Sequence, residues 1–178
     1  MIVGKKIILR ALKRKDTELV LKWINDPKLK YLTGTLYPVS DVEHEKWFEN
    51  KLLEKTNKLF GIEEQLSSQL IGLIGFNNID FINRTTEISV YIGEENQRGK
   101  GLGTDALRTL IKFAFDELNL HRVSLVVFSY NTNAIKAYEK IGFKTEGILK
   151  ESLYKAGRYH DKILMAVVNN KENSLLGE

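Results

Sequence analysis

The stretch Gln97-Arg98-Gly99-Lys100-Gly101-Leu102-Gly103-Thr104 decides the fold, because it joins a strand-like segment, 85–92, to a periodic helical segment that begins near Gly103. Glycines at alternate positions let the backbone turn tightly and approach a ligand closely. The first amides of the helix have no partner within it, and the helix dipole adds partial positive charge there. Arg98 and Lys100 add further charge, so we interpret residues 97–104 as a loop that binds phosphate or pyrophosphate.

Two other phosphate-binding loops have different requirements. A nucleoside-triphosphate loop places Ser or Thr directly after its lysine, whereas Gly101 and Leu102 follow Lys100 here, which excludes that loop. A dinucleotide fingerprint matches better, because three small residues have its spacing: Gly101, Gly103 and Ala106. The next strand, however, ends at residues 129–131 without a carboxylate for a ribose, and only one strand-helix-strand unit follows. A doubly wound sheet is therefore not expected.

Outward from the loop, the apolar periodicity predicts a mixed arrangement of strands and helices. Strands are expected at 6–12, 59–64, 69–76, 85–92, 122–128, 146–154 and 162–168, and those at 59–64, 69–76 and 85–92 are expected to form an antiparallel meander. One early helix is capped by Asp16 and ended by Pro27, and a second is capped by Ser40 or Asp41. A further helix follows the strand at 122–128 and is ended by Gly142.

Length and composition bound the class of protein. The 178 residues, 43% hydrophobic and 28% charged, suit one domain with a buried core, so we predict a single domain over 1–178 with a polar tail at 169–178. The apolar runs are far shorter than the roughly 20 residues of a membrane-spanning helix, and no cleavable leader is recognised, so we expect a cytoplasmic protein without a membrane partner. The absence of cysteine excludes disulfides and a thiolate nucleophile. The net charge of +4 is spread along the chain, which does not predict a nucleic-acid partner.

A second motif follows the strand predicted at 122–128. Its spacing, Asn-x-x-Ala-x-x-x-Tyr-x-x-x-Gly-Phe, is met by Asn131, Ala134, Tyr138, Gly142 and Phe143. The first loop fits the spacing Gln/Arg-x-x-Gly-x-Gly/Ala. With both patterns in this order, the chain resembles the GNAT superfamily of N-acetyltransferases, and within it the ribosomal-protein alanine and polyamine acetyltransferases. The layout is similar over 6–168, and the specific motifs lie within a core at 85–143.

This resemblance implies an α/β fold with a mixed, mostly antiparallel twisted sheet of about seven strands that splits into a V, with helices on both faces. It also implies that acetyl-CoA lies in the cleft between the fourth and fifth strands, with the pantetheine arm along the fourth strand and the pyrophosphate in the loop. The amide of Ile92 would polarise the thioester carbonyl. The residues that would contact acetyl-CoA are Val90, Tyr91, Ile92, Gln97, Arg98, Gly99, Lys100, Gly101, Leu102, Gly103, Thr104, Asn131, Asn133, Lys136 and Tyr138. Lys136 and Lys140 lie one helical turn apart, so they suit nucleotide phosphates, although an ordinary solvated basic face explains them equally well.

Acetyl transfer to an amine requires a base for the amine and stabilisation of the oxyanion, and it benefits from an acid for the departing thiolate. The resemblance makes Tyr138 the acid; the other interpretation is a core tyrosine packed against Phe143. We expect Glu87 as the base, because it shares one strand face with Ser89 and Tyr91. An ion pair on an exposed strand face explains Glu87 equally well.

The three histidines are not expected in the chemistry. His44 is predicted at the surface of the second helix and His121 in a charged loop, while the neighbours His160 and Asp161 would point to opposite faces of a strand. No set of histidines and carboxylates has the spacing of metal ligands, so no metal is expected.

The acceptor and the partners stay open. Direct attack in a ternary complex is favoured, and the acceptor is a protein N-terminus or a small amine such as a polyamine or an amino sugar. A polyamine needs several converging carboxylates, for which the evident supply is Glu43, Glu45, Glu49, Glu63 and Glu64. A non-catalytic acyl-CoA sensor would use the same loop, and nucleic-acid binding is a weaker third hypothesis. The oligomeric state is not decided by the sequence, and a homodimer is one of the states left open.

Overall fold

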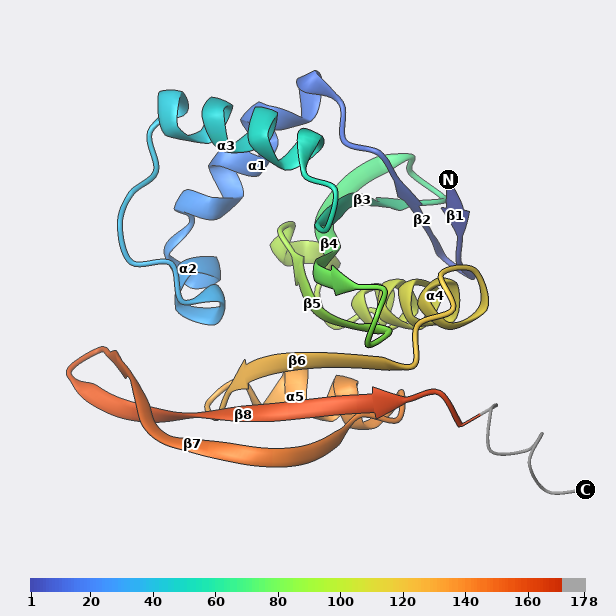
Figure 1. The fold of residues 1–178 in the computed structure, drawn as a ribbon. Helices are drawn as coiled ribbons and strands as arrows, with labels where there is room; N and C mark the ends of the chain where they lie inside the picture. Colours follow the sequence, from blue (N-terminus) through green and yellow to red (C-terminus); the bar gives the residue numbers. More distant parts are fainter. Residues whose placement is uncertain (171–178) are drawn as a thin grey trace, which may run out of the picture. The chain divides into compact units, whose positions relative to one another are not determined.

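The computed structural model describes residues 1–170, and it is a mixed α/β structure with an eight-stranded, mostly antiparallel sheet (Figure 1). The strands are hydrogen-bonded in the order β1-β2-β3-β4-β5-β6-β8-β7. Along the chain the elements are β1 (Ile2–Val3), β2 (Ile7–Arg10), α1 (Thr17–Asn25), α2 (Pro27–Thr33), α3 (Asp41–Leu53), β3 (Lys58–Glu64), β4 (Gln69–Asp80), β5 (Thr85–Ile92), α4 (Leu102–Asp116), β6 (Arg122–Phe128), α5 (Thr132–Glu139), β7 (Lys144–Lys155) and β8 (Arg158–Val168).

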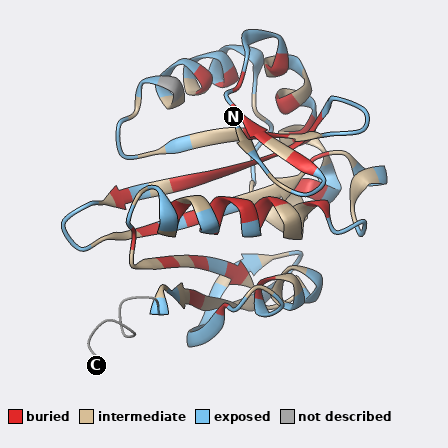
Figure 2. Cartoon of the chain, turned by 90° about the vertical axis from the view of Figure 1, so that its right-hand side faces the viewer, coloured by how far each residue is buried: buried red, intermediate tan, exposed pale blue. Residues whose placement is uncertain are grey.

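The chain forms two compact units, which are described separately. The first comprises residues 1–78 and 89–110, and the second comprises residues 79–88 and the chain from residue 111 on. In both, buried residues recur along the strands while the outward faces of the helices are exposed (Figure 2). This alternation is the pattern expected of elements with one apolar face.

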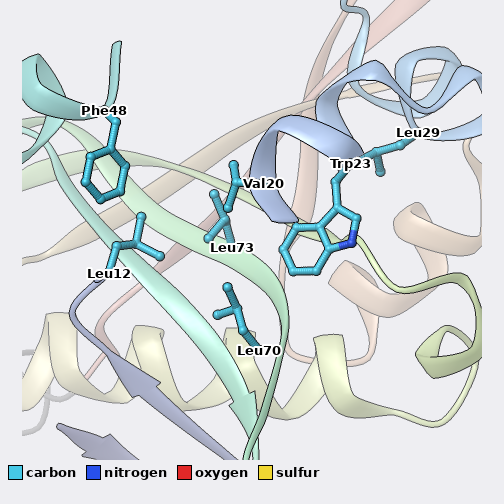
Figure 3. Close-up of a cluster of buried hydrophobic side chains, with 7 residues drawn as sticks. All are labelled: Leu12, Val20, Trp23, Leu29, Phe48, Leu70 and Leu73. Carbon is cyan, nitrogen blue, oxygen red and sulfur yellow. The ribbon is translucent and has the colours of Figure 1, made fainter. Parts of the chain in front are cut away.

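In the first unit, β1 to β4 form successive antiparallel pairs, and helices α1 to α3 pack against them through one apolar cluster. Figure 3 shows side chains from α1, α3 and β4 pointing into this common core. The cluster consists of Leu12, Val20, Trp23, Leu29, Phe48, Leu70 and Leu73. Burial of such side chains is the main favourable contribution to folding.

The ends of the early helices follow local rules. Ser40 caps α3, and its hydroxyl and the Glu43 carboxylate complete a reciprocal capping box, as predicted for Ser40. Pro27 follows the end of α1, also as predicted, but it begins α2, a helix that the prediction lacked. Proline suits the first turn of a helix, and the Asp26 carboxylate accepts the Leu29 amide at 2.8 Å.

A buried charged network ties β2 to the start of α1. Arg10 donates to Asp16 at 2.7 and 3.1 Å and to Glu63 at 2.5 Å, and Arg10 and Asp16 are 7% and 5% exposed. Asp16 also accepts the Lys13 amide at 2.7 Å. Buried charges require such partners, because an unpaired ion in the interior is strongly unfavourable.

In the second unit, β5 and β6 pair in parallel from Thr85 with Arg122 to Glu87 with Ser124. β6 is antiparallel to β8, and β8 forms a long hairpin with β7. The turn between them consists of Ala156 and Gly157, with φ of 52° and 80°, which suits a tight hairpin turn.

The predicted fold class is confirmed, with eight strands where about seven were expected. The additional strand is β1, which pairs with β2 across a short turn near Gly4. The division of the sheet into a V and the single domain over 1–178 stay predictions. The predicted tail at 169–178 lies outside the described residues except for its first two positions.

Candidate functional site

The loop 97–104 has the backbone that its glycines predict. Gly99 and Gly101 have φ of 77° and 81°, in the left-handed region that glycine adopts most easily. A Cβ atom at either position would meet nothing within 4 Å, so the loop borders open space. Both glycines are therefore needed for the conformation of the backbone and leave it open to a ligand, and neither is required by close packing.

The start of α4 presents free main-chain donors. The first helical bond runs from the Asp105 amide to the Gly101 carbonyl at 3.0 Å. The three amides before it, those of Leu102, Gly103 and Thr104, lie at the positive end of the helix dipole and have no intrahelical acceptor. Such a turn can bind the oxygens of a phosphate group.

The charged residues of the loop also hold it in place. Arg98 donates to the carbonyls of Ile92 and Gly93, both at 2.9 Å, so its guanidinium fastens the loop to the end of β5. Lys100 donates to Gln97 at 3.0 Å, and Gln97 donates to Glu64 at 3.2 Å. Gln97, Arg98 and Lys100, which are predicted to contact acetyl-CoA, thus also hold the loop in position.

The end of β5 is held in place by β4 and α1. The amides of Gly93 and Glu94 both donate to the Ile71 carbonyl, at 2.8 and 3.2 Å. The Trp23 ring lies against Gly93, where a Cβ would come within 2.1 Å of it, and its Nε1 donates to Glu94 at 2.9 Å. Two successive amides on one carbonyl indicate a bulge, which re-aims the strand beside the loop.

Residues 90–92 and the loop therefore come together within the first unit. The side chain of Ile92 lies beside the start of α4, 3.5 Å from the position of a Cβ on Gly103. Tyr91 packs edge-on against Trp23 with ring centroids 6.3 Å apart. Burial raises the pKa of the Tyr91 phenol far above its ordinary value, so it stays neutral.

A pocket of about 590 Å³ opens beside β5 in the same unit. Its walls come from α1, the segment 35–39, α3, the start of β3, β4 and β5, and they are mainly apolar and aromatic. From β5, Ser89 and Tyr91 line it, and Asn77 of β4 donates to the Ser89 hydroxyl at 3.2 Å. A pocket of this size and composition suits a small-molecule substrate or the end of a peptide.

The Asn25 side chain holds the end of the segment 35–39 at Val39. The amide group of Asn25 donates to the Val39 carbonyl at 2.8 Å and accepts the Val39 amide at 2.9 Å. The sequence alone does not predict this wall of the pocket or its anchor Asn25, because neither belongs to a motif. The sequence signal in this region is Gly34 and Pro38, residues that favour turns and loops over regular elements.

His44 corrects a prediction. It is 3% exposed instead of lying at the surface, its Nε2 is 3.1 Å from the Thr17 carbonyl oxygen, and its ring stacks on Trp47 with centroids 5.1 Å apart. Burial lowers its pKa, an effect partly opposed by the bond to Thr17, so His44 is neutral near pH 7. The prediction failed because the acidic neighbours of His44 lie on other faces of α3.

The second unit contains the remaining predicted residues. Asn131 caps α5 by accepting the Ala134 amide at 3.3 Å, while Asn133, Lys136 and Lys140 are exposed. Tyr138 is 8% exposed and packs against Phe143 with ring centroids 5.8 Å apart. Burial raises its pKa to about 12, so the phenol is fully protonated at neutral pH.

Glu87 and the other polar candidates have different surroundings. Glu87 is exposed and belongs to the second unit, whereas Ser89 and Tyr91 belong to the first. Asp161 accepts Lys150 and the Glu151 amide, both at 2.9 Å. Within residues 1–170, no group of three or more potential ligands is placed to hold a metal ion.

The five carboxylates considered for a polyamine each have a partner. Glu45 and Glu49 pair with Arg14, Glu63 pairs with Arg10, Glu43 accepts from Ser40, and Glu64 accepts from Ser67 and Gln97. They contact different elements and do not form one converging cluster of free charge.

Comparison with known proteins identifies the family. The model of the acetyltransferase (GNAT) domain matches residues 6–144. The chain belongs to the GNAT acetyltransferases. It is 33% identical over 174 residues to YdaF of Bacillus subtilis (strain 168), named as a candidate ribosomal N-acetyltransferase, with 95% of this chain and 94% of that protein covered.

Solved structures of GNAT acetyltransferases agree with this. The spermidine N-acetyltransferase from Vibrio cholerae in complex with CoA and spermine has a TM-score of 0.86 at 28% identity, over 94% of this chain and 98% of that one. A dodecameric structure of that enzyme in an intermediate state has a TM-score of 0.80 at 29% identity, over 95% and 97%. The chain is thus an N-acetyltransferase, and the comparisons do not favour a non-catalytic sensor. Within residues 1–170, no helix is long and apolar enough to cross a membrane.

Proposed function

We propose that acetyl-CoA is the donor and that a primary amine attacks it directly in a ternary complex. The observation that carries this proposal is the set of unpaired amides at the start of α4, beside a loop whose glycines border open space. This arrangement suits a pyrophosphate. The CoA complex of the Vibrio cholerae enzyme supports the same donor.

The proposed cofactor contacts follow the motifs of the family. The main chain of residues 90–92 would pair with the pantetheine, residues 97–104 would hold the pyrophosphate, and the amide of Ile92 would polarise the thioester carbonyl. From the second unit, Asn131 and Asn133 would contact the pantetheine, and Lys136 would contact the nucleotide phosphates.

The family match at 6–144 includes segments of both units, so we propose that they act as one domain. We further propose the cytoplasm as its location, since acetyl-CoA is the donor.

The proposed chemistry requires three groups. Glu87 would take a proton from the ammonium form of the acceptor, directly or through water, and the free amine would attack the carbonyl carbon. The Ile92 amide would stabilise the resulting oxyanion. The carbon–sulfur bond then breaks, and Tyr138 would give its proton to the thiolate. The excess proton that the attacking nitrogen still carries would return to the Tyr138 phenolate through water, which leaves a neutral amide and a free thiol. A phenol with a pKa of about 12 is fully protonated at neutral pH, so this proton is present when the thiolate leaves.

The experiment measures the amine-dependent release of thiol from acetyl-CoA over a panel of amines. Tyr138→Phe should lower kcat by about a hundredfold, the usual size of general-acid catalysis, with an unchanged Kd for CoA. Tyr159→Phe, which removes a hydroxyl from an exposed hairpin residue, is the matched control. Full turnover by Tyr138→Phe would show that Tyr138 is not the acid.

Glu87→Gln tests the base in the same assay. Loss of the carboxylate should lower kcat most at the acid end of the pH range, where the acceptor amine is most protonated. Glu151→Gln, at another exposed position, is the control. Equal activity of Glu87→Gln and wild type would assign the base to water or another group. Normal CoA binding without turnover of any amine would indicate a sensor.

We extend the proposal to a homodimer formed through β7. This strand is last in the hydrogen-bonding order, and its apolar residues Ile148 and Leu149 are 50% and 47% exposed. Exposed apolar residues on an edge strand offer a surface for association. Analytical ultracentrifugation should give the mass of two chains for wild type and of one for Ile148→Lys. A wild-type mass of one chain, or of many as in the dodecameric Vibrio cholerae enzyme, would contradict a simple dimer.

A further inference from the structure

The geometry points to an acceptor that carries an apolar or aromatic body next to its amine and that binds this body in the pocket of the first unit. This inference rests on the proposed acetyl transfer and narrows its acceptor. It predicts that polyamines, which carry several ammonium groups spaced along the molecule, are poor substrates.

The walls of the pocket are the first observation. Most of the residues that line its volume of about 590 Å³ are apolar or aromatic, including Ile24, Pro38, Trp47, Leu59, Phe76 and Tyr91. A polycation would have to give up its hydration against these walls without compensating charge. An apolar or aromatic body would instead gain the free energy of leaving water.

The charges at the pocket are the second observation. Its lining contains one carboxylate, Glu43, and two ammonium groups, Lys51 and Lys58. Glu43 already accepts hydrogen bonds from the Ser40 amide at 2.9 Å and from the Ser40 hydroxyl at 2.7 Å. The hydrogen bond from the Ser40 amide is the main cause of the lowered pKa of Glu43. Lys51 pairs with Glu54 at 2.9 Å, which leaves the charge of Lys58 without a carboxylate partner among the lining residues.

The remaining titratable groups around the pocket add no negative charge. His44 is buried with its Nε2 at the Thr17 carbonyl, and burial keeps Tyr91 neutral. Lys58 donates to the Glu54 carbonyl at 2.9 Å. The lining residues therefore include no group of free carboxylates of the kind that would recognise several ammonium groups at once.

The position of the pocket is the third observation. Ser89 and Tyr91 line it, and they alternate along β5 with Val90 and Ile92, whose main chain is proposed to meet the thioester. An amine held at the β5 side of the pocket would thus lie next to the strand that carries the proposed oxyanion donor. The body of the acceptor would extend toward α3 and the segment 35–39.

The first experiment compares acceptors in the thiol-release assay with purified wild type. The probes are 2-phenylethylamine, the dipeptide amide Ala-Phe-NH₂ and spermidine. We expect at least about tenfold higher kcat/KM for one or both apolar-bodied probes than for spermidine, a difference of about 1.4 kcal/mol. A higher kcat/KM for 2-phenylethylamine would identify the acceptor as a small molecule. A higher kcat/KM for Ala-Phe-NH₂ would identify it as a protein N-terminus.

Other outcomes distinguish a wrong acceptor from a wrong reaction. Preference for spermidine over both other probes would overturn the inference and leave acetyl transfer intact. Calorimetry that detects no binding of CoA, with no thiol released by any amine, would instead overturn the proposed function.

Charge reversal tests the pocket itself. Lys58→Glu puts a carboxylate at the pocket wall, so the ratio of kcat/KM for spermidine to that for 2-phenylethylamine should rise by about three- to tenfold. Lys55→Glu makes the same change in net charge at an exposed position outside the lining and should leave the ratio unchanged. Equal ratios in Lys58→Glu and Lys55→Glu, with both proteins folded and able to bind CoA, would show that this pocket does not receive the acceptor.

Discussion

Two regions of the first unit differ in how closely they are packed. The packed base comprises Arg10, Gly72 and Gly93 with their contacts, and the open rim comprises the loop 97–104 and the segment 35–39. In the base, a Cβ on Gly93 would lie 2.1 Å from the Trp23 ring, and one on Gly72 would lie 2.2 Å from the Tyr91 carbonyl oxygen. In the rim, the glycines at 99 and 101 face open space.

Stability and ligand binding are thus located in separate parts of the first unit. Side chains of the base are enclosed and fully partnered, so changes there should lower the free energy of unfolding. The rim consists of a turn and a loop fastened at a few points, so changes there should weaken binding while the fold persists.

The largest effect is expected at the buried network of the base. Arg10→Met leaves the carboxylates of Asp16 and Glu63 without their cation, which should lower the free energy of unfolding by about 3–5 kcal/mol in urea titrations. Arg14→Met is the control, because Arg14 makes exposed pairs with Glu45 and Glu49 that are worth about 0–1 kcal/mol. Similar losses in both variants would mean that the base is not stabilised by this network.

The same network predicts sensitivity to acid. Desolvation raises the pKa of Asp16, but bonds from Arg10 and the Lys13 amide outweigh it and hold the pKa below its ordinary value of 3.8. Because the folded pKa is the lower one, the stabilisation by Asp16 is complete above pH 3.8 and is lost as the pH falls through the folded pKa. Asp16→Asn should therefore show a shallower loss of stability than wild type as the pH falls below about 4 in acid titrations of the folded state.

The next effect is expected at Gly93. The methyl group of Gly93→Ala overlaps the Trp23 ring, which should lower stability by about 1–3 kcal/mol in thermal unfolding. Trp23→Leu provides space, so the double variant should be more stable than the sum of the two single losses predicts. Strict additivity would indicate that the ring and Gly93 do not interact.

The two regions also differ in how far the sequence predicts them. The conformation of the loop 97–104 depends on glycines within eight residues, so its turn and the helix start at Leu102 could be predicted locally. The pocket combines α1, the segment 35–39, α3 and three strands, and no short pattern encodes that combination. His44 shows the same limit, because its burial results from packing on Trp47 and Thr17 rather than from its polar neighbours. The helix after Pro27 was missed since the proline was interpreted only as a helix end.

In the rim, Gly101→Ala should affect binding more than folding. An alanine at φ of 81° costs about 1–2 kcal/mol, and a shift of the turn to relieve this strain would misdirect the amides that follow it. We expect about tenfold weaker binding of CoA by calorimetry. Gly157→Ala, at φ of 80° in the β7–β8 turn and also in open space, should lose similar stability with unchanged CoA affinity. Equal affinities in both variants would contradict the anion-binding role of the loop.

The smallest effect is expected at Asn25, which holds the segment 35–39 of the rim. Asn25→Ala removes both hydrogen bonds to the Val39 main chain, and these partly buried bonds are worth about 0.5–1.5 kcal/mol each. The segment 35–39 should then move more freely, so KM for the acceptor should rise about threefold while the Kd for CoA is unchanged. Asn50→Ala, at an exposed position of α3, is the control.

Asn25→Asp tests whether both hydrogen bonds are needed. Its carboxylate could accept the Val39 amide but could not donate to the Val39 carbonyl. If both bonds are needed, KM for the acceptor should be raised at least as much in Asn25→Asp as in Asn25→Ala. An unchanged KM in both Asn25 variants would show that the wall of the pocket is positioned by packing alone.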